Sequence, residues 1–188
     1  MKRSTFLLLA FLSMNTLFYS SCGKDDPCDL ITCLNGGVCI NGECDCPEGY
    51  EGPDCSNIQT PTNIRILNIK VTRFPATEAN GASWDLTSGP DIYVQVLYNN
   101  GVIYDHPTVF ENANPAQSYD FQPNVNLNIT NPTNRYVVRL YDYDSTGSDD
   151  FMGGIEFTPF TGTNGFPQTI TIDANGGVAF ELTYDYTF

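Results

Sequence analysis

The chain has 188 residues and a formal net charge of −14, with 22 acidic residues against eight Lys and Arg. This charge excludes nonspecific attraction to nucleic acid or to an anionic membrane surface, because both require a basic protein surface. A hydrophobic fraction of 41% and an aromatic fraction of 13% exclude a chain without a core, and frequent Tyr, Phe, Gly and Pro favour β structure.

The first 21 residues have the pattern of a secretory signal peptide. Lys2 and Arg3 give it a positive start, and the apolar run Phe6–Leu12 is far shorter than the roughly 20 residues of a membrane-spanning helix. We therefore expect residues 1–21 to be removed. The mature chain would then have 6 cations and 22 acids, a net charge of −16.

Two serines stand directly before Cys22. Small residues in this position resemble the lipobox of bacterial lipoproteins, which implies that Cys22 is lipidated and becomes the new N-terminus. Asp25 and Asp26 lie in the tether that follows, residues 22–27, and resemble the surface-export signal of some Gram-negative bacteria. Both resemblances imply a lipid-anchored protein of the outer membrane that is exposed at the cell surface. The alternative is ordinary secretion with a free Cys22.

All seven cysteines lie between positions 22 and 55. Six of them fall within a segment too short to bury a useful hydrophobic core, so we expect disulfides to hold this segment together. A zinc site is the alternative, but zinc sites usually have separated Cys pairs or added His, and the single histidine is the distant His106. Spacing alone leaves the pairing open among Cys28, Cys33, Cys39, Cys44, Cys46 and Cys55.

Residues 28–55 closely resemble an EGF-like domain, on the segments Cys33–Cys39 (CLNGGVC) and Cys44–Cys55 (CDCPEGYEGPDC). Calcium-binding members of that family have a longer stretch between their third and fourth cysteines than the four residues 40–43. We therefore expect a rigid spacer or protein-contact module without calcium. The resemblance implies disulfides that pair Cys28 with Cys39, Cys33 with Cys44, and Cys46 with Cys55.

Residues 56–62 form a polar linker that contains Pro61, and residues 63–188 contain strand patterns separated by turn residues. A slip in the alternation at Ile66–Leu67 indicates a β-bulge. We expect an eight-stranded antiparallel β-sandwich. Its predicted strands are residues 64–74, 92–98, 108–110, 119–121, 136–143, 155–157, 169–172 and 178–188.

Acidic residues gather in two loops of this domain. Two carboxylates about 4 Å apart repel by about 4 kcal/mol at an effective dielectric near 20, and a hard cation reverses that cost. Calcium takes six to eight oxygen ligands, whereas zinc favours Cys and His, and magnesium keeps more water. The alternative is ordinary turn chemistry, in which Asp is common. The acids are Asp85 and Asp91 in the first loop, and Asp142, Asp144, Asp149 and Asp150 in the second.

Residues 63–188 resemble a C2 domain. Asp85 and then Asp91 before Ile92-Tyr93-Val94 resemble its first calcium loop, and Asn114-Pro115 before Tyr119–Phe121 resembles its central strand. Residues 138–144 with Asp150 resemble its third calcium loop. The last strand resembles the first strand of the alternative C2 topology, which implies the type II arrangement. The resemblance implies a calcium site formed by Asp85, Asp91, Asp142, Asp144 and Asp150, with Asp149 as an extra, solvated acid.

C2 domains usually dock on phospholipid through calcium and through apolar loop tips that insert into the bilayer. Trp84 and Leu86 flank Asp85 and are the candidates for insertion, although Trp84 could instead pack at the end of the sandwich. The tip of the third loop, residues 145–148, is polar, and basic strand residues are few. We therefore expect calcium-dependent docking to a lipid, a glycan or a protein.

Two alternatives remain for the function. In one, calcium only stabilises the loops of a structural or adhesive surface protein. In the other, the acids form the metal site of a hydrolase. The sequence has no Ser/His or Cys/His arrangement for catalysis, and His106 is expected to be an exposed turn residue. We therefore expect a binding protein and not an enzyme.

Overall fold

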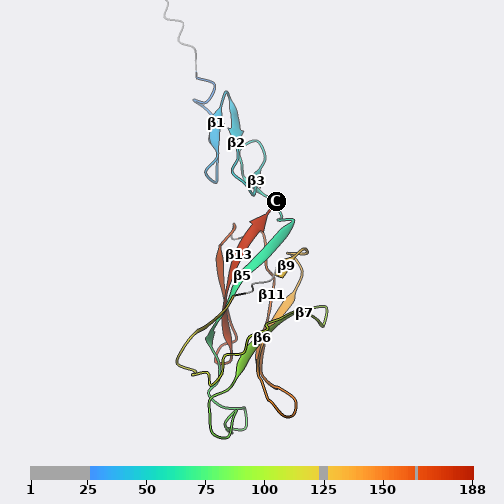
Figure 1. The fold of residues 1–188 in the computed structure, drawn as a ribbon. Helices are drawn as coiled ribbons and strands as arrows, with labels where there is room; N and C mark the ends of the chain where they lie inside the picture. The colour runs from blue at the N-terminus through green and yellow to red at the C-terminus, as the bar shows by residue number, and fades with distance from the viewer. Residues whose placement is uncertain (1–25, 123–126, 164) are drawn as a thin grey trace, which may run out of the picture.

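A computed structural model describes residues 26–122, 127–163 and 165–188. These residues form a small disulfide-rich module followed by a larger β-sandwich, and Figure 1 shows the two modules end to end. Within these ranges the chain forms strands and turns without a helix, and hence without any helix suited to cross a bilayer. The expected signal peptide, the lipidation of Cys22 and the role of Asp25 all fall outside the described residues.

The first module contains two short antiparallel hairpins. Asn41 and Gly42 connect the strands of the first hairpin, and both have positive φ angles, 54° and 93°. A tight turn of this kind favours Asn and Gly, because they tolerate the left-handed region. The hairpins pair β1 (Val38–Ile40) with β2 (Glu43–Asp45), and β3 (Tyr50–Glu51) with β4 (Asn57–Ile58).

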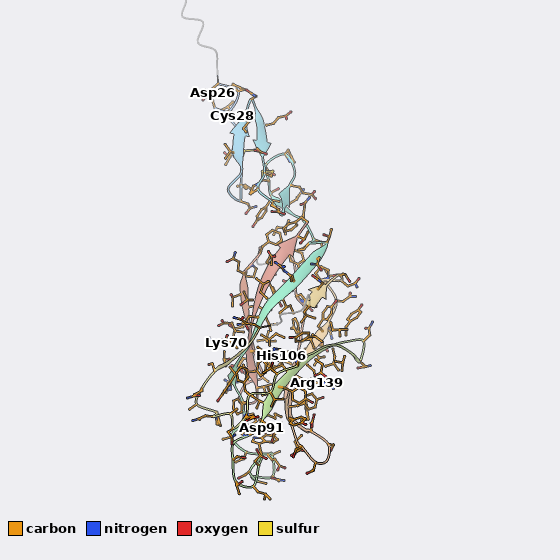
Figure 2. The ribbon with its side chains drawn as sticks, in the orientation of Figure 1. Asp26, Cys28, Lys70, Asp91, His106 and Arg139 are labelled. Atoms are coloured by element: carbon orange, nitrogen blue, oxygen red, sulfur yellow. A yellow bond between two sulfur atoms is a disulfide. The ribbon has the colours of Figure 1, made fainter. Side chains whose placement is uncertain are left out.

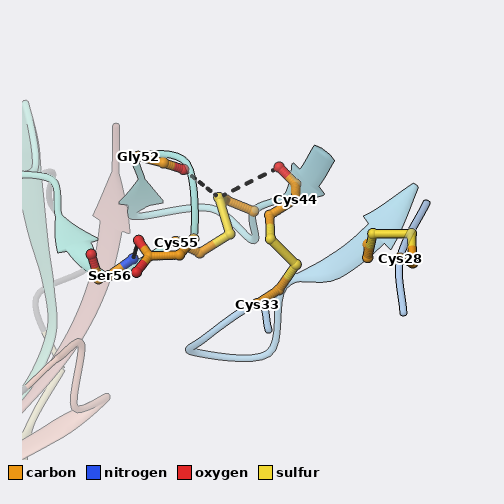
Figure 3. Close-up of a disulfide and its surroundings, with 9 residues drawn as sticks. Cys28, Cys33, Cys44, Gly52, Cys55 and Ser56 are labelled. Carbon is orange, nitrogen blue, oxygen red and sulfur yellow. Dashed lines mark hydrogen bonds between the residues drawn. A yellow bond between two sulfur atoms is a disulfide. The ribbon is translucent and has the colours of Figure 1, made fainter. Parts of the chain in front are cut away.

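Three disulfides hold this module together (Figure 3). They join Cys28 to Cys39, Cys33 to Cys44, and Cys46 to Cys55, the same three pairs that the EGF-like resemblance implies. Most side chains of the module are exposed or half-buried. Cross-links therefore do the work that a hydrophobic core does in a larger domain.

Two sheets form the larger domain. The first is four-stranded, in the order β11-β10-β6-β7, and the second has β13 between β12 and β5. Both β8 and β9 pair with β5, along the edge that β13 leaves free, so they follow one another in a single strand position. The strands are β5 (Asn63–Arg73), β6 (Ile92–Tyr98), β7 (Gly101–Asp105), β8 (Tyr119–Phe121), β9 (Leu127–Ile129), β10 (Tyr136–Asp142), β11 (Asp150–Phe157), β12 (Thr169–Asp173) and β13 (Ala179–Thr187).

The hydrophobic core lies between these two sheets. Side chains alternate along the strands, so that Val138 and Leu140 of β10 are fully buried while Arg139 between them is half-buried. Phe180 and Leu182 of β13 are buried in the same core from the other sheet. The sequence prediction of an antiparallel β-sandwich is confirmed, with nine strands in eight positions among the described residues.

The predicted bulge in the first long strand is present. Asn68 pairs with Thr183 and Ile66 pairs with Tyr184, which leaves Leu67 without a partner in the register. Leu67 is 40% exposed, whereas Ile66 and Ile69 on either side are buried. The extra residue therefore restores the inward direction of the following apolar side chains.

One strand prediction was wrong, and two strands were missed. Residues 108–110 form no strand, because only Phe110 bridges to Ile92. The sequence reading missed β7, which follows a tight turn at Asn99 and Asn100, both with positive φ. It also missed β9, a strand of only three residues.

Candidate metal centre

The two acidic loops lie at the end of the sandwich farthest from the EGF-like module. Figure 2 shows Asp91 near this end and Asp26 at the opposite end of the molecule. The antiparallel pairing of β6 with β10 explains the meeting of the loops, because Ile92 stands opposite Asp142. The main-chain N–H of Tyr143 also donates to the carbonyl oxygen of Asp91 at 2.8 Å. The sheet register thus brings the first and third loops together.

Asp142 is the only buried polar or charged side chain among the described residues, with 1% of its surface exposed. Its Oδ1 accepts a hydrogen bond from the main-chain N–H of Asp91 at 2.6 Å, whereas Oδ2 has no hydrogen-bond partner. Burial raises the pKa of Asp142 to about 6, against the lowering effect of the Asp91 N–H, and the charges of Asp85, Asp144 and Asp91 raise it further. A buried carboxylate with an orphaned oxygen among like charges suits a cation.

Asp144 and Asp150 extend this group of charges along the third loop. Desolvation raises the pKa of Asp144, and the charges of Asp150, Asp85, Asp149 and Asp91 add to the effect. Asp150 stands opposite Asp142 in the pairing of β10 with β11 and is exposed. Each of the other four predicted ligands therefore interacts electrostatically with Asp144.

The first-loop acids are engaged in local hydrogen bonds. Asp85 Oδ2 accepts from the Ser88 hydroxyl at 3.0 Å, and Asp91 Oδ1 accepts from the main-chain N–H of Asn112 at 2.8 Å. In the part of the chain that is described, no three His, Cys, Asp or Glu side chains are placed so that they could hold a metal ion. The five carboxylates thus share one end of the sandwich without forming a coordination shell, and the calcium site stays a prediction.

Asp149 is not the solvated acid that the sequence suggested. It is half-buried, and its Oδ2 accepts from the Tyr93 hydroxyl at 2.7 Å. Its Oδ1 accepts from the main-chain N–H of Asp144 at 3.2 Å. Burial and the hydrogen bond to Asp149 raise the pKa of Tyr93, so the phenol stays a neutral donor. Asp149 therefore ties the third loop to β6.

The two predicted contact residues of the first loop have different environments. Trp84 is half-buried against the hydrophobic core, and its indole N–H donates to the carbonyl oxygen of Pro75 at 2.9 Å. Leu86 is fully exposed. Of the two, only Leu86 is free to contact a partner.

Two exposed aromatic residues beside the third loop were missed by the sequence reading. Tyr143 is 46% exposed and Phe151 is 55% exposed, and they lie at the beginning and end of this loop. The Phe151 ring contacts Tyr141, which stacks on Tyr93 at 5.4 Å between centroids. Their positions in the sequence, directly after Asp142 and Asp150, could have identified them. The sequence reading considered only the polar tip of the loop, residues 145–148.

His106 differs from its expected role as an exposed turn residue. It is half-buried, and its ring packs edge-on against Phe121 with 5.0 Å between centroids. Nδ1 lies 3.1 Å from the main-chain nitrogen of Thr108 and can accept its hydrogen. These contacts give His106 a packing role.

Residues 26–55 match the EGF-like domain family. Over 42 residues the chain is 45% identical to EGF-like repeat and discoidin I-like domain-containing protein 3 of Mus musculus, which covers 19% of this chain and 9% of that protein. The Homo sapiens protein of the same name is 40% identical over 65 residues, or 31% of this chain and 13% of that protein. The chain therefore spans only about a tenth of the length of these relatives.

Solved structures similar to this chain include a C2 domain, with 18% identity, a TM-score of 0.47 and coverage of 67% of this chain and 98% of that one. A C2 domain of plant extended synaptotagmin 1 has 14% identity and a TM-score of 0.38, and covers 69% and 99%. Human GIVD cytosolic phospholipase A2 has 15% identity and a TM-score of 0.40, and covers 66% and 16%. Because these TM-scores are below 0.5, the sandwich is defined by its own strand order and the site by its own side chains.

Proposed function

We propose that the sandwich is a C2-like module that binds calcium through Asp85, Asp91, Asp142, Asp144 and Asp150. The observation that carries this proposal is the environment of Asp142, a buried carboxylate with one unpartnered oxygen among three further acidic charges. Oxygen ligands of this kind suit calcium, and binding would require the two loops to bring them within its ligand distance of about 2.3–2.6 Å.

We further propose that calcium bound here makes the loops a docking surface. Calcium would cancel part of the negative charge, and Leu86 and Tyr143 would supply exposed apolar area beside it. The partner would be a lipid, a glycan or a protein. Docking rather than catalysis is proposed, since His106, the one histidine of the chain, packs against Phe121.

Attachment of the protein to a membrane belongs to the same proposal. Lipidation of Cys22 in a Gram-negative outer membrane would place the acidic tether and the EGF-like module between the anchor and the sandwich. Mass spectrometry of protein extracted from membranes would detect a lipid-modified Cys22 as the N-terminus. A mature chain that begins at another residue, or that keeps the Cys22 thiol free, would contradict the anchor.

Calorimetric titration with calcium tests the metal site. Wild type should bind calcium, and Asp142→Asn and Asp91→Asn should each weaken binding by at least about tenfold, or about 1.4 kcal/mol, because each removes a charged ligand. Asp29→Asn removes one charge from the EGF-like module and is the matched control. Absence of calcium binding in wild type would contradict the proposal.

A second candidate function is purely structural, and the same buried carboxylate supports it. A cation that relieves the repulsion on Asp142 stabilises the folded state whether or not a partner binds. Calcium would then raise the melting temperature of the protein. The protein would not be retained on phosphatidylserine vesicles, glycan arrays or protein partners. Retention that a chelator reverses would favour docking.

A further inference from the structure

An aromatic cluster joins the EGF-like module to the sandwich. Phe166, in the loop before β12, has its ring centroid 5.4 Å from that of Tyr50 in the EGF-like module. The same ring lies 4.8 Å from Phe188 and 5.4 Å from Tyr186 of the sandwich, and it stacks on Phe160 at 5.7 Å. Phe166 therefore has aromatic neighbours in both modules.

Gly49 brings the main chain of the EGF-like module directly onto this cluster. A Cβ at position 49 would lie 2.4 Å from Phe166 Cε2 and 2.7 Å from Phe188 Cζ, closer than side-chain atoms can approach. The φ angle of Gly49 is +87°, which also disfavours any other residue. The contact therefore requires both the missing side chain and the unusual backbone.

The segment between the modules is bound along its length. Asn57–Ile58 is strand β4 and pairs with β3, and the main-chain N–H of Gln59 donates to the carbonyl oxygen of Gly49 at 2.9 Å. Pro61 is buried, and the N–H of Thr62 donates to the carbonyl oxygen of Thr187 in β13 at 2.8 Å. The expected linker, residues 56–62, is thus part of both modules and leaves little chain free to act as a hinge.

We propose that this joint makes the EGF-like module and the sandwich one rigid unit, with Phe166 and Phe188 holding the two together. The acidic loops and Asp26 lie at opposite ends of that unit (Figure 2). The loops are then held facing away from whatever the N-terminal end is attached to. This last step rests on the proposed docking function, and it implies a partner on an opposing surface.

Nitrogen-15 relaxation of the full chain tests the joint, and a calcium chelator keeps the result independent of the metal site. In wild type, the amides of residues 28–55, 63–122, 127–163 and 165–188 should fit a single rotational diffusion tensor. Phe166→Ala combined with Phe188→Ala should give the EGF-like module a shorter correlation time than the sandwich. Phe151→Ala removes an exposed ring that contacts Tyr141 beside the third loop, and it should leave shared tumbling unchanged.

Gly49→Ala is a second route to the same result, because it disturbs the joint from the EGF-like side and leaves the sandwich sequence intact. Retained amide dispersion of the sandwich and intact disulfides would establish that a variant is folded. Independent tumbling in wild type would overturn the rigid unit. Shared tumbling in both the double variant and Gly49→Ala would overturn the role of the aromatic cluster. Neither outcome depends on whether calcium binds.

Discussion

The main-chain N–H of Asp91 donates to Oδ1 of Asp142 at 2.6 Å, and this bond joins the two acidic loops across the β6–β10 pair. The bond satisfies one oxygen of a buried carboxylate and leaves the other without a partner. It fixes Asp142 in an environment where the charged form is unfavourable until a cation arrives. The behaviour of the protein with pH and with calcium follows from this arrangement.

Without calcium, Asp142 should make the protein less stable as the pH rises. Its pKa is raised from the ordinary 3.8 to about 6 in the folded state, so the folded state binds the proton more tightly than the unfolded state. Its contribution to stability is therefore complete below pH 3.8 and is lost as the pH rises to about 6. The difference is on the order of 3 kcal/mol, from about 1.4 kcal/mol per pKa unit.

Urea unfolding in a chelator between pH 3.5 and pH 7 measures this loss, with Asp142→Asn to isolate the contribution of the one group. The free energy of unfolding of wild type minus that of Asp142→Asn should fall as the pH rises across this range. Saturating calcium should abolish the fall, because it favours the ionised carboxylate. If this difference in unfolding free energy does not change with pH in the chelator, ionisation of Asp142 does not destabilise the folded state, and the prediction is wrong.

Tyr93→Phe should weaken calcium binding although it removes no ligand. The Tyr93 hydroxyl donates to Asp149, which in turn holds the main chain of Asp144. Loss of this bond costs about 1 kcal/mol and loosens the third loop, so calcium affinity should fall about fivefold. Calorimetry is the measurement, and Tyr98→Phe, which loses a hydroxyl contact with Asn134 outside the acidic loops, is the control. Equal affinities in wild type and Tyr93→Phe would contradict this role.

Trp84 and Leu86 should separate stability from docking. Trp84→Ala should destabilise the protein by about 2 kcal/mol, because the ring packs on the core and its N–H bonds to Pro75. Leu86→Ser should change stability by less than about 0.5 kcal/mol, because the side chain is fully exposed. If the loops dock, Leu86→Ser should weaken retention on the partner at saturating calcium. A Leu86→Ser protein that is strongly destabilised would contradict the structure.

The sequence predicted the features of the fold that depend on a local pattern of residues. The alternation of side chains predicted the sandwich, and its slip at Leu67 predicted the bulge. One extra residue in a strand reverses which of the following side chains face the core. The EGF-like resemblance gave the cysteine pairing that spacing alone left open. The hairpin turn at Asn99 and Asn100 was equally visible, and overlooking it concealed β7.

Tertiary contacts explain what the sequence could not provide. The hydrogen bonds of Asp149, the packing of Trp84 and the position of His106 all depend on neighbours that are distant in the chain. The joint shows the same limit, since Phe166 meets Tyr50 across 116 positions of sequence. The composition of residues 56–62 predicts a polar linker. It cannot reveal that their main chain bonds to Gly49 in one module and to Thr187 in the other.

Reduction of the disulfides should unfold the EGF-like module and leave the sandwich folded. All six paired cysteines lie in residues 28–55, and the loss of a native disulfide from a small domain typically costs about 2–5 kcal/mol. The core of the sandwich is formed by both sheets and needs no cross-link. After treatment with a reductant, amide signals of residues 28–55 should collapse to unfolded positions, while those of β6, β10 and β13 persist. Shifts confined to the sandwich amides near Phe166 and Phe188 should report the lost joint, and an alkylated, reduced protein that keeps a folded EGF-like module would contradict the prediction.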